Sequence, residues 1–394
     1  MRVEPDISGL DGQPRNGHRP LMRRKKLAFL LPDMRGGGAE RVALRLMEDF
    51  VAAGHEVQLV LMEARGELMP LLPPEIRVFD LGARRIRNVM LPLRRYFREE
   101  QPDAIQVSMW PLTVVGVLAH RLSRSRARVV LSEHITLSKQ YSYLGRIAWA
   151  QLRQSIRFFY PVANARIAVS RQAADDLARI SGIPRETIDV VYNPVSAPPK
   201  DAAPGPDVEA FWGGAAARII TVGSLKAQKN HKLLIASFAR LVRTRPARLM
   251  ILGEGELRGE LEQMARDEGV AEHVVMPGFF ADPWPFYLSA NLFALSSDYE
   301  GYPLVLIEAM RAGLPIVSTD CESGPDEILA GGRFGALVPC GDAEAFAGAM
   351  ARMLDDPTDA QVLRDRAESL SGQDTSDRYL QLMTGEPVER RNRP

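Results

Sequence analysis

Short apolar runs alternate with longer segments of helical period along most of the chain, from residue 26 onward. Runs of about five apolar residues bounded by turn-forming residues are typical of buried strands, and apolar side chains spaced three or four residues apart indicate helices. The pattern predicts strands at residues 27–31, 56–62, 76–81, 104–108, 128–132, 165–169, 218–222, 248–252, 273–276, 291–294, 316–318 and 336–338. It predicts helices at residues 39–53, 112–122, 231–243, 257–268, 304–312 and 343–354. This alternation indicates an α/β fold of parallel sheets covered by helices.

The length of the chain predicts two lobes, because 394 residues exceed what one hydrophobic core usually serves. Residues 196–214 are rich in Pro, Gly and Ala and have no period, so we expect a linker between a first lobe at 25–195 and a second lobe at 215–385. The ends, 1–24 and 386–394, are expected to be loosely ordered. The last helix can belong to the second lobe or pack back on the first. Ligands of doubly wound sheets bind beyond the carboxyl ends of the strands, which places the site between the lobes.

The composition, 46% hydrophobic and 25% charged, is that of a globular protein. No apolar run reaches the roughly 20 residues of a membrane span, and two cysteines in so long a chain favour a reducing cytoplasm. The net charge of +1 hides an asymmetry, because residues 81–171 hold 16 Arg and Lys against 4 Asp and Glu. A basic first lobe favours an anionic membrane surface or a phosphate-bearing substrate as partner, and no nucleic acid is expected.

A glycine-rich turn, Gly36 to Gly38, follows the first predicted strand and opens a helix. Free amides and the positive helix end would suit a phosphate or a sugar there, although such a turn is also a common structural feature. A dehydrogenase would need a G-x-G-x-x-G pattern and an acid at the end of the second strand. Here Leu61 and Met62 occupy that end, so the dehydrogenase interpretation is disfavoured.

The corresponding turn of the second lobe carries Lys226 and Lys229 just before a predicted helix. An ammonium group at that place would stabilise the negative charge that grows on a diphosphate as a sugar–phosphate bond breaks. The alternative is a pair of solvated lysines at a helix start.

Two carboxylates, Glu300 and Glu308, flank a second loop-to-helix junction, in which Pro303 is expected at the first helical position. Carboxylates accept hydrogen bonds from vicinal hydroxyls, and Gly301 would let the backbone approach a sugar ring. Glu308 lies among apolar helix residues, so a ligand partner explains it better than a surface position.

With these residues the chain resembles the retaining glycosyltransferases of family 4, which have the GT-B architecture of two facing Rossmann-like lobes. The resemblance runs from about residue 26 to 382 and rests on four segments in the family's order: GGGAERV at 36–42, GSLKAQKNH at 223–231, EGYPLVLIE at 300–308 and SGPDEIL at 323–329. It implies a nucleotide-sugar donor, with UDP-sugars favoured over GDP-mannose, and no cofactor or metal.

The resemblance also implies roles for individual residues. His134, Lys229 and Glu300 would be catalytic, with His134 facing the donor sugar, Lys229 on the diphosphate and Glu300 on the transferred sugar. Glu308 would hold the ribose hydroxyls. The remaining donor-binding residues would be Gly37, Gly38, Ser224, Gly253, Gly255, Gly301, Tyr302, Pro303 and Leu304.

One position departs from the family, because Ser224 stands where relatives usually carry an Arg. One positive charge on the diphosphate would then be missing, for which Lys226 is the candidate replacement. Gly253 and Gly255 would belong to a loop near the nucleotide base.

The expected reaction is transfer of a hexose or N-acetylhexosamine, with retention, to a growing cell-surface glycan, linked to a lipid diphosphate. Aromatic and basic residues interleave over 139–160, which suits either a peripheral contact at the inner face of the membrane or a core helix with a basic solvent face. Two alternatives are a UDP-N-acetylglucosamine 2-epimerase-like enzyme and a degenerate protein that only binds a glycan or nucleotide.

Overall fold

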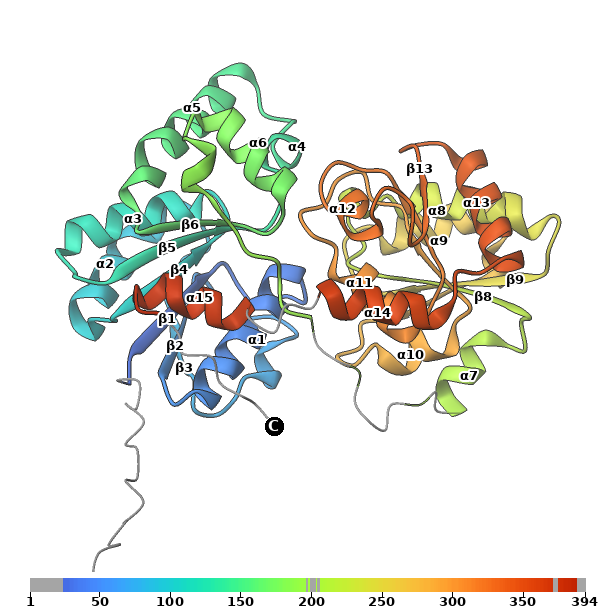
Figure 1. The fold of residues 1–394 in the computed structure, drawn as a ribbon, viewed down its shortest axis with the longest axis horizontal. Coiled ribbons are helices and arrows are strands. Elements are labelled where there is room, and N and C mark those ends of the chain that lie inside the picture. The colour runs from blue at the N-terminus through green and yellow to red at the C-terminus, as the bar shows by residue number, and fades with distance from the viewer. Residues whose placement is uncertain (1–23, 196–197, 199–202, 204–205, 371–374, 388–394) are drawn as a thin grey trace, which may run out of the picture.

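The chain forms two α/β lobes that lie side by side (Figure 1). The computed structural model describes residues 24–195, 198, 203, 206–370 and 375–387. Most of the predicted tails and the first part of the predicted linker lie outside these residues. The last part of that linker is the helix α7 (Pro206–Trp212), whose Trp212 is fully buried in the second lobe. One large apolar side chain therefore anchors a segment whose composition had suggested a linker.

The first lobe is built on a seven-stranded sheet in which every pair of neighbouring strands is parallel. Its order is β3-β2-β1-β4-β5-β6-β7. The strands are β1 (Lys26–Leu31), β2 (Glu56–Leu61), β3 (Arg77–Asp80), β4 (Ala104–Ser108), β5 (Arg128–Glu133), β6 (Ala165–Ala168) and β7 (Asp189–Val190). The six strands predicted here are confirmed. The two-residue β7 was not predicted, because so short a pairing leaves no periodic signal.

Helices cover both faces of this sheet, so its strands are apolar on both sides. Alternate residues of β1 point to opposite faces: Leu27 and Phe29 pack with α1, and Ala28 and Leu30 pack with the layer of α2, α3, α5 and α6. The helices are α1 (Gly38–Ala52), α2 (Met90–Glu100), α3 (Leu112–Ser123), α4 (Leu137–Gln140), α5 (Arg146–Phe159) and α6 (Arg171–Ser181).

The second lobe has a six-stranded parallel sheet of order β10-β9-β8-β11-β12-β13. All six strands predicted for it are present, as β8 (Ala217–Val222), β9 (Ala247–Leu252), β10 (Val274–Gly278), β11 (Leu292–Leu295), β12 (Ile316–Thr319) and β13 (Ala336–Val338). Its helices are α8 (His231–Val242), α9 (Arg258–Asp267), α10 (Trp284–Ser289), α11 (Leu304–Ala312), α12 (Pro325–Leu329), α13 (Ala343–Asp355), α14 (Ala360–Leu370) and α15 (Thr375–Thr384).

The last of these helices, α15, lies on the first lobe rather than the second (Figure 1). Its Tyr379, Leu380 and Met383 are buried in the same apolar cluster as α1. The helix before it, α14, packs on α11 of the second lobe. The chain end therefore crosses back and ties the two lobes together.

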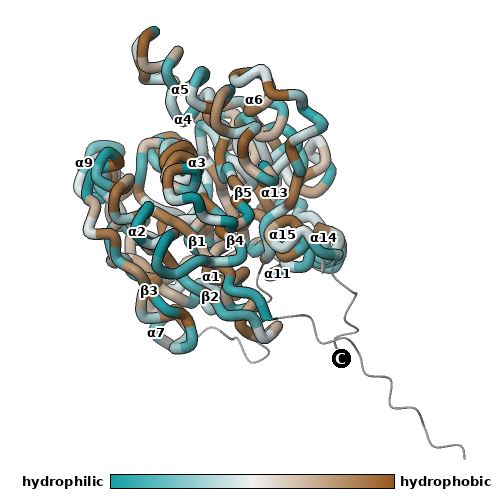
Figure 2. Tube along the Cα trace, turned by 90° about the vertical axis from the view of Figure 1, so that its left-hand side faces the viewer, coloured by the Kyte–Doolittle hydropathy of each residue, from teal (hydrophilic) through white to brown (hydrophobic). Residues whose placement is uncertain are grey.

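In both sheets the strand order reverses at a position that faces the other lobe, between β1 and β4 and between β8 and β11. Ligands of doubly wound sheets bind at such switch points. The helix α1 and the 3-10 helix η5 (Ala227–Lys229) are the first helical elements after β1 and β8. The tube view shows α9, which is rich in charged residues, as hydrophilic, in line with its place on the outside of the second lobe (Figure 2). Within the described residues, no helix is long and apolar enough to cross a membrane.

Candidate active site

Two loops from opposite lobes meet at Gly301. A Cβ atom at this position would lie 2.0 Å from the carbonyl oxygen of His134 and 3.0 Å from Cα of Ile135. These neighbours are backbone atoms, so glycine is required for the close approach. Beside this contact the buried Thr136 hydroxyl of the first lobe donates a hydrogen bond of 3.0 Å to the carbonyl oxygen of Glu300. The loop after β5 and the loop after β11 are thereby held against each other.

The Glu300 carboxylate is buried and fully engaged. Lys229 Nζ lies 2.7 Å from Glu300 Oε1, and the Ser297 hydroxyl donates to the same oxygen at 2.6 Å. Gln228 Nε2 donates to the other oxygen at 3.4 Å. The side chains of Lys229 and Glu300 are 15% and 7% exposed, so the ion pair is largely shielded from water. Two residues that the sequence placed 71 positions apart in one site are therefore in direct contact.

Lys229 owes its position to the turn between β8 and α8. Its aliphatic stem passes over Gly223, where a Cβ would already be 3.4 Å from Cε of Lys229. The Ser296 hydroxyl donates to the Lys229 carbonyl oxygen at 2.9 Å, and Asn230, in the left-handed conformation, caps α8 by accepting from the Leu233 amide at 3.1 Å. The backbone that carries the Lys229 ammonium group is therefore fixed by the Ser296 hydrogen bond and by the Asn230 cap.

His134 enters the site from the carboxyl end of β5. Burial lowers the pKa of His134 to about 4, so the imidazole is neutral near pH 7. Its Nε2 lies 3.0 Å from the Ser132 hydroxyl, whereas Nδ1 is buried and has no partner among the described residues. The structure therefore places a neutral histidine on the loop that touches Gly301.

Glu308 lies one turn inside α11 and is partly buried. The Tyr287 hydroxyl donates to its Oε2 at 2.8 Å. Burial raises the pKa of Glu308, and the positive charge of Arg41, which reaches it from the first lobe, acts in the opposite direction. The guanidinium of Arg41 stands over the ring of Phe279 at 5.6 Å, a second contact between lobes. Glu308 therefore faces the first lobe, although it belongs to the second.

The helix α11 begins at Leu304, as its predicted range has it, but Pro303 occupies the N-cap position rather than the first helical position. Among the described residues, the amides of Gly301, Tyr302 and Leu304 donate no hydrogen bond. Such unpaired first-turn amides are available to a ligand. The Tyr302 side chain instead packs on Tyr192, at 5.0 Å between ring centroids.

The glycine turn of the first lobe differs from the open anion site that the sequence suggested. The Gly36 amide donates to Glu67 at 3.4 Å, and the Gly37 amide donates to the Arg35 carbonyl oxygen. The carboxylate of Glu40 folds back over Gly37, and burial raises its pKa to about 7. Of the three glycines, only Gly38 faces open space. A carboxylate from the first turn already fills this helix start, which the glycine pattern could not show.

The absence of side chains at Gly253 and Gly255 lets the backbone of a neighbouring loop approach closely. A Cβ at Gly253 would lie 2.0 Å from the carbonyl oxygen of Gly223, and one at Gly255 would lie 2.5 Å from that of Leu225. Gly253 also has a φ of +149°. In this structure the two glycines allow the loop after β9 to pack against the loop after β8. Ser224 makes no side-chain hydrogen bond within the described part of the chain, and Lys226 is exposed.

Several residues that support the site carried no role in the sequence analysis. Ser323, with a φ of +74°, donates from its hydroxyl to the Gly301 carbonyl oxygen at 2.8 Å and lies 2.7 Å from the Ser170 hydroxyl of the first lobe. Thr136 and Ser297 contact Glu300 as described above. The segment at 323–329 had marked Ser323 as part of a motif, but the contacts of Thr136 and Ser297 depend on tertiary structure alone.

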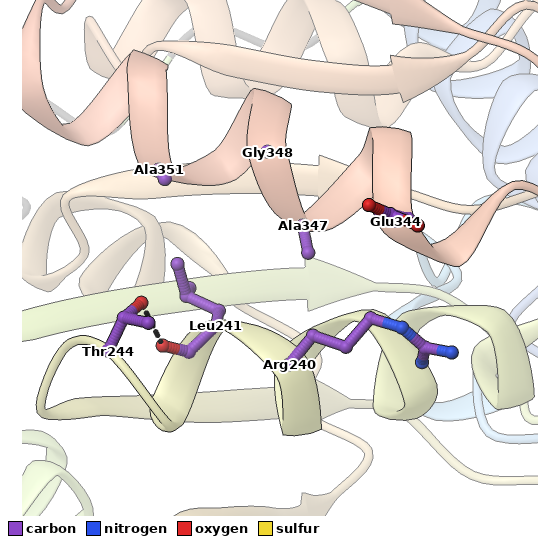
Figure 3. Close-up of a pocket in the computed structure, with 7 residues that line it drawn as sticks. All are labelled: Arg240, Leu241, Thr244, Glu344, Ala347, Gly348 and Ala351. Atoms are coloured by element: carbon purple, nitrogen blue, oxygen red, sulfur yellow. Dashed lines mark hydrogen bonds between the residues drawn. The ribbon is translucent and has the colours of Figure 1, made fainter.

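The grooves elsewhere on the surface are separate from these residues. One lies between α8 and α13, lined by Leu241, Thr244 and Ala347 among others (Figure 3), and another lies along α2. In the part of the chain that the structure describes, no three His, Cys, Asp or Glu side chains gather as a metal site would require.

Comparison with known protein families identifies the family to which both lobes belong. A model described as Glycosyltransferase Family 4 matches residues 36–197, and one described as Glycosyl transferases group 1 matches residues 212–370. Among curated relatives, a 4-alpha-N-acetylgalactosaminyltransferase of Campylobacter jejuni, named for a diphospho-undecaprenol acceptor, is 26% identical over 88% of this chain and 94% of its own. The lipopolysaccharide 1,6-galactosyltransferase of Salmonella typhimurium is 32% identical over 49% of this chain and 53% of its own.

Solved structures share the fold. Anabaena HepE in complex with UDP-glucose has a TM-score of 0.77 at 19% identity, over 92% of this chain and 100% of its own. The apo form of the lipopolysaccharide outer core galactosyltransferase WaaB has a TM-score of 0.67 at 22% identity, over 91% of this chain and 99% of its own.

Two lobes, each built on a parallel sheet, define the GT-B fold. The chain belongs to the group 1 and family 4 glycosyltransferases, whose two models together span both lobes. Other relatives are named for lipopolysaccharide core biosynthesis in Rhizobium meliloti and for amylovoran biosynthesis in Erwinia amylovora. The epimerase and binding-only interpretations are therefore set aside.

Proposed function

We propose that this glycosyltransferase takes a hexose or N-acetylhexosamine from a nucleotide sugar and transfers it, with retention, to a lipid-linked cell-surface glycan. The observation that carries the proposal is the shielded Lys229–Glu300 pair at the switch point of the second sheet, held against His134 of the first lobe. The geometry of the site and the membership of the glycosyltransferase family both favour binding of the nucleotide-sugar donor at Lys229 and Glu300.

The Lys229–Glu300 contact explains how a donor would be received. A diphosphate carries more negative charge than one carboxylate, so it would compete successfully for the Lys229 ammonium. Glu300 would then lose its cation and become free to accept hydrogen bonds from sugar hydroxyls, while Ser297 and Gln228 keep it in place. The unpaired amides at the start of α11 lie beside this carboxylate and would hold the same sugar. Donor binding would therefore release the Glu300 carboxylate from Lys229 in the same step.

Glu308 would accept hydrogen bonds from the ribose of the donor. Its carboxylate is already oriented by the Tyr287 hydroxyl, and it faces Arg41 of the first lobe. Burial raises the pKa of the Glu308 carboxyl, and the Tyr287 hydrogen bond and the Arg41 charge act in the opposite direction. Replacing Glu308 by Ala should therefore weaken donor binding, and unchanged turnover would contradict this role.

Catalysis would be mainly electrostatic, because positive charge grows on the sugar and negative charge on the leaving diphosphate. Lys229 would stabilise the leaving group, and the neutral His134 would face the sugar without adding a positive charge to it. The leaving phosphate would take the proton of the acceptor hydroxyl, so no side-chain nucleophile is needed. We also propose that no metal takes part.

The donor is best identified by thermal shift with UDP-, GDP- and TDP-sugars, because a ligand that binds the folded state raises its melting temperature. A UDP-sugar is favoured. One structural neighbour was solved with UDP-glucose, and a mannosyltransferase relative from Mycolicibacterium smegmatis is named as GDP-mannose-dependent, so both nucleotides belong in the screen. A protein stabilised by none of the three nucleotides would overturn the proposed donor class.

The acceptor is proposed to lie at a membrane surface. The first lobe carries the basic excess, and relatives named for diphospho-undecaprenol and phosphatidylinositol acceptors use lipid-linked substrates by their names. Flotation with anionic vesicles at low and high salt tests the electrostatic part, because screening must weaken it. Equal binding to neutral and anionic vesicles would contradict a charge-driven contact.

A further inference from the structure

Aromatic side chains gather beside the Glu300 loop, at the carboxyl end of the first sheet. Trp110 and Tyr141 pack edge to face, with ring centroids 4.8 Å apart, and Tyr143 continues the cluster at 6.3 Å from Tyr141. Tyr299 of the second lobe joins it, because its hydroxyl donates to Gln140 Oε1 at 3.1 Å. Tyr143 is 76% exposed. The residue after Tyr299 is Glu300, so the cluster adjoins the proposed donor sugar.

Two members of this aromatic cluster, Trp110 and Tyr141, are fixed by hydrogen bonds. The Tyr141 hydroxyl donates to the Trp110 carbonyl oxygen at 2.6 Å, and Trp110 Nε1 donates to the Ser155 hydroxyl at 3.0 Å. The Trp110 amide donates to the buried Glu133 at 3.4 Å. Rings held in this way lose little conformational entropy when a ligand stacks on them. Trp110 and Tyr141 therefore form a preorganised aromatic wall, beside which the exposed ring of Tyr143 lies.

The rim of the wall is polar. Lys139 and Glu322 form an ion pair of 3.0 Å across the lobes, and the phenol groups of Tyr143 and Tyr299 lie close enough to interact with each other. A lipid chain on this wall would desolvate charges and hydroxyls without compensation. A pyranose ring has an apolar face that can stack on the aromatic rings and hydroxyls that can bind the polar rim. Small-molecule sites commonly combine an apolar wall with a few polar groups in this way.

We propose that Tyr143, with Trp110 and Tyr141, forms the acceptor subsite, on which the terminal sugar ring of the acceptor glycan stacks. The inference rests on the proposed function, because it needs the donor sugar at Glu300. The acceptor hydroxyl must reach the anomeric carbon of the donor, and the wall is continuous with the Glu300 loop through Tyr299. Both views place α4 and α5, which flank Tyr143, together at one end of the first lobe (Figures 1 and 2).

Binding of simple sugars tests the subsite without any turnover. Saturation-transfer NMR would be recorded with methyl glycosides of glucose, galactose, N-acetylglucosamine and N-acetylgalactosamine, in the presence of UDP. We expect a signal from the ring protons of at least one glycoside. Tyr143→Ala should weaken that binding by about tenfold, as expected for the loss of an aromatic stacking partner, and Tyr143→Phe should retain it.

The matched control is Phe158→Ala, which removes another exposed aromatic ring, 66% exposed, from the far end of α5. It should leave glycoside binding unchanged. Equal binding by wild type and Tyr143→Ala, or no binding of any of the four glycosides, would overturn the subsite. A Tyr143→Ala protein that loses only vesicle flotation would also overturn it, in favour of a membrane contact. The thermal shift with nucleotide sugars reports separately on the proposed function, because it depends on the Lys229–Glu300 pair.

Discussion

Removal of the Lys229 charge should destabilise the second lobe, because it leaves the Glu300 carboxylate buried without its cation. The substitution Lys229→Met keeps the aliphatic stem that packs over Gly223 and deletes only the ammonium group. The remaining donors to Glu300 are neutral, from Ser297 and Gln228. The experiment therefore isolates the ion pair.

The magnitude follows from the burial of the pair. Breaking a fully buried ion pair costs about 3–5 kcal/mol, and a surface pair contributes about 1 kcal/mol or less. With Glu300 7% and Lys229 15% exposed, and two hydrogen bonds left on the carboxylate, the lower end of the buried range applies. A loss of about 3 kcal/mol in a lobe of this size lowers Tm by roughly 6–12 °C.

Urea unfolding and calorimetry of a double-mutant cycle provide the assay. Glu300→Gln alone should cost less, because its partner Lys229 is the more exposed side chain. Lys229→Met with Glu300→Gln should recover most of the stability, since neither charge is then left alone. Nucleotide sugars should raise Tm for the wild type and hardly at all for Lys229→Met. A loss within about 1 kcal/mol for Lys229→Met would refute the shielded pair.

Four further results are expected. Burial raises the pKa of Glu133 from 4.5 to about 7, so its contribution to stability is full below 4.5 and is lost as pH rises through 7. Urea unfolding measured from pH 4.5 to above pH 7 should show that Glu133→Gln abolishes this loss, and an unaltered pH dependence would contradict it. Gly301→Ala places a Cβ 2.0 Å from the His134 carbonyl oxygen and should lower kcat/KM about 100-fold, whereas near-normal turnover would show that the loops can separate freely. Thr136→Val leaves the Glu300 carbonyl oxygen without its donor and should cost about 1–3 kcal/mol in urea unfolding, with Thr136→Ser restoring it. EDTA should leave turnover unchanged, and abolished turnover would show a metal requirement.

Local pattern was sufficient for the elements and for the residue types of the site. Parallel strands that are buried on both faces produce unbroken apolar runs, and amphipathic helices produce a clear period, so the predicted strands and helices agree with the observed ones to within two residues at most ends. Glu308 was recognisable because a carboxylate among apolar helix residues needs a partner. That partner, the Tyr287 hydroxyl, lies 21 residues earlier and was not recognisable.

Segments with strong apolar anchors but weak period were misjudged from sequence. The helix α7 lies in a stretch dominated by Pro, Gly and Ala, and Trp212 determines that it folds with the second lobe. The glycine turn at 36–38 suggested free amides, but Glu40 and Glu67 reach it through side-chain conformations that no spacing rule describes.

Sequence alone determined the fold class and the two lobes, because these depend on local period and on residue type, whereas the resemblance to family 4 predicted Lys229, Glu300, Glu308 and His134 in one site. Only the tertiary structure decided that Lys229 pairs with Glu300, that Thr136 holds Glu300 from the other lobe, and that Gly301 is fixed by the backbone of His134. The first two of those contacts join residues 71 and 164 positions apart. These contacts form only because the two sheets face each other. The hydrophobic period of either segment carries no information about that long-range arrangement.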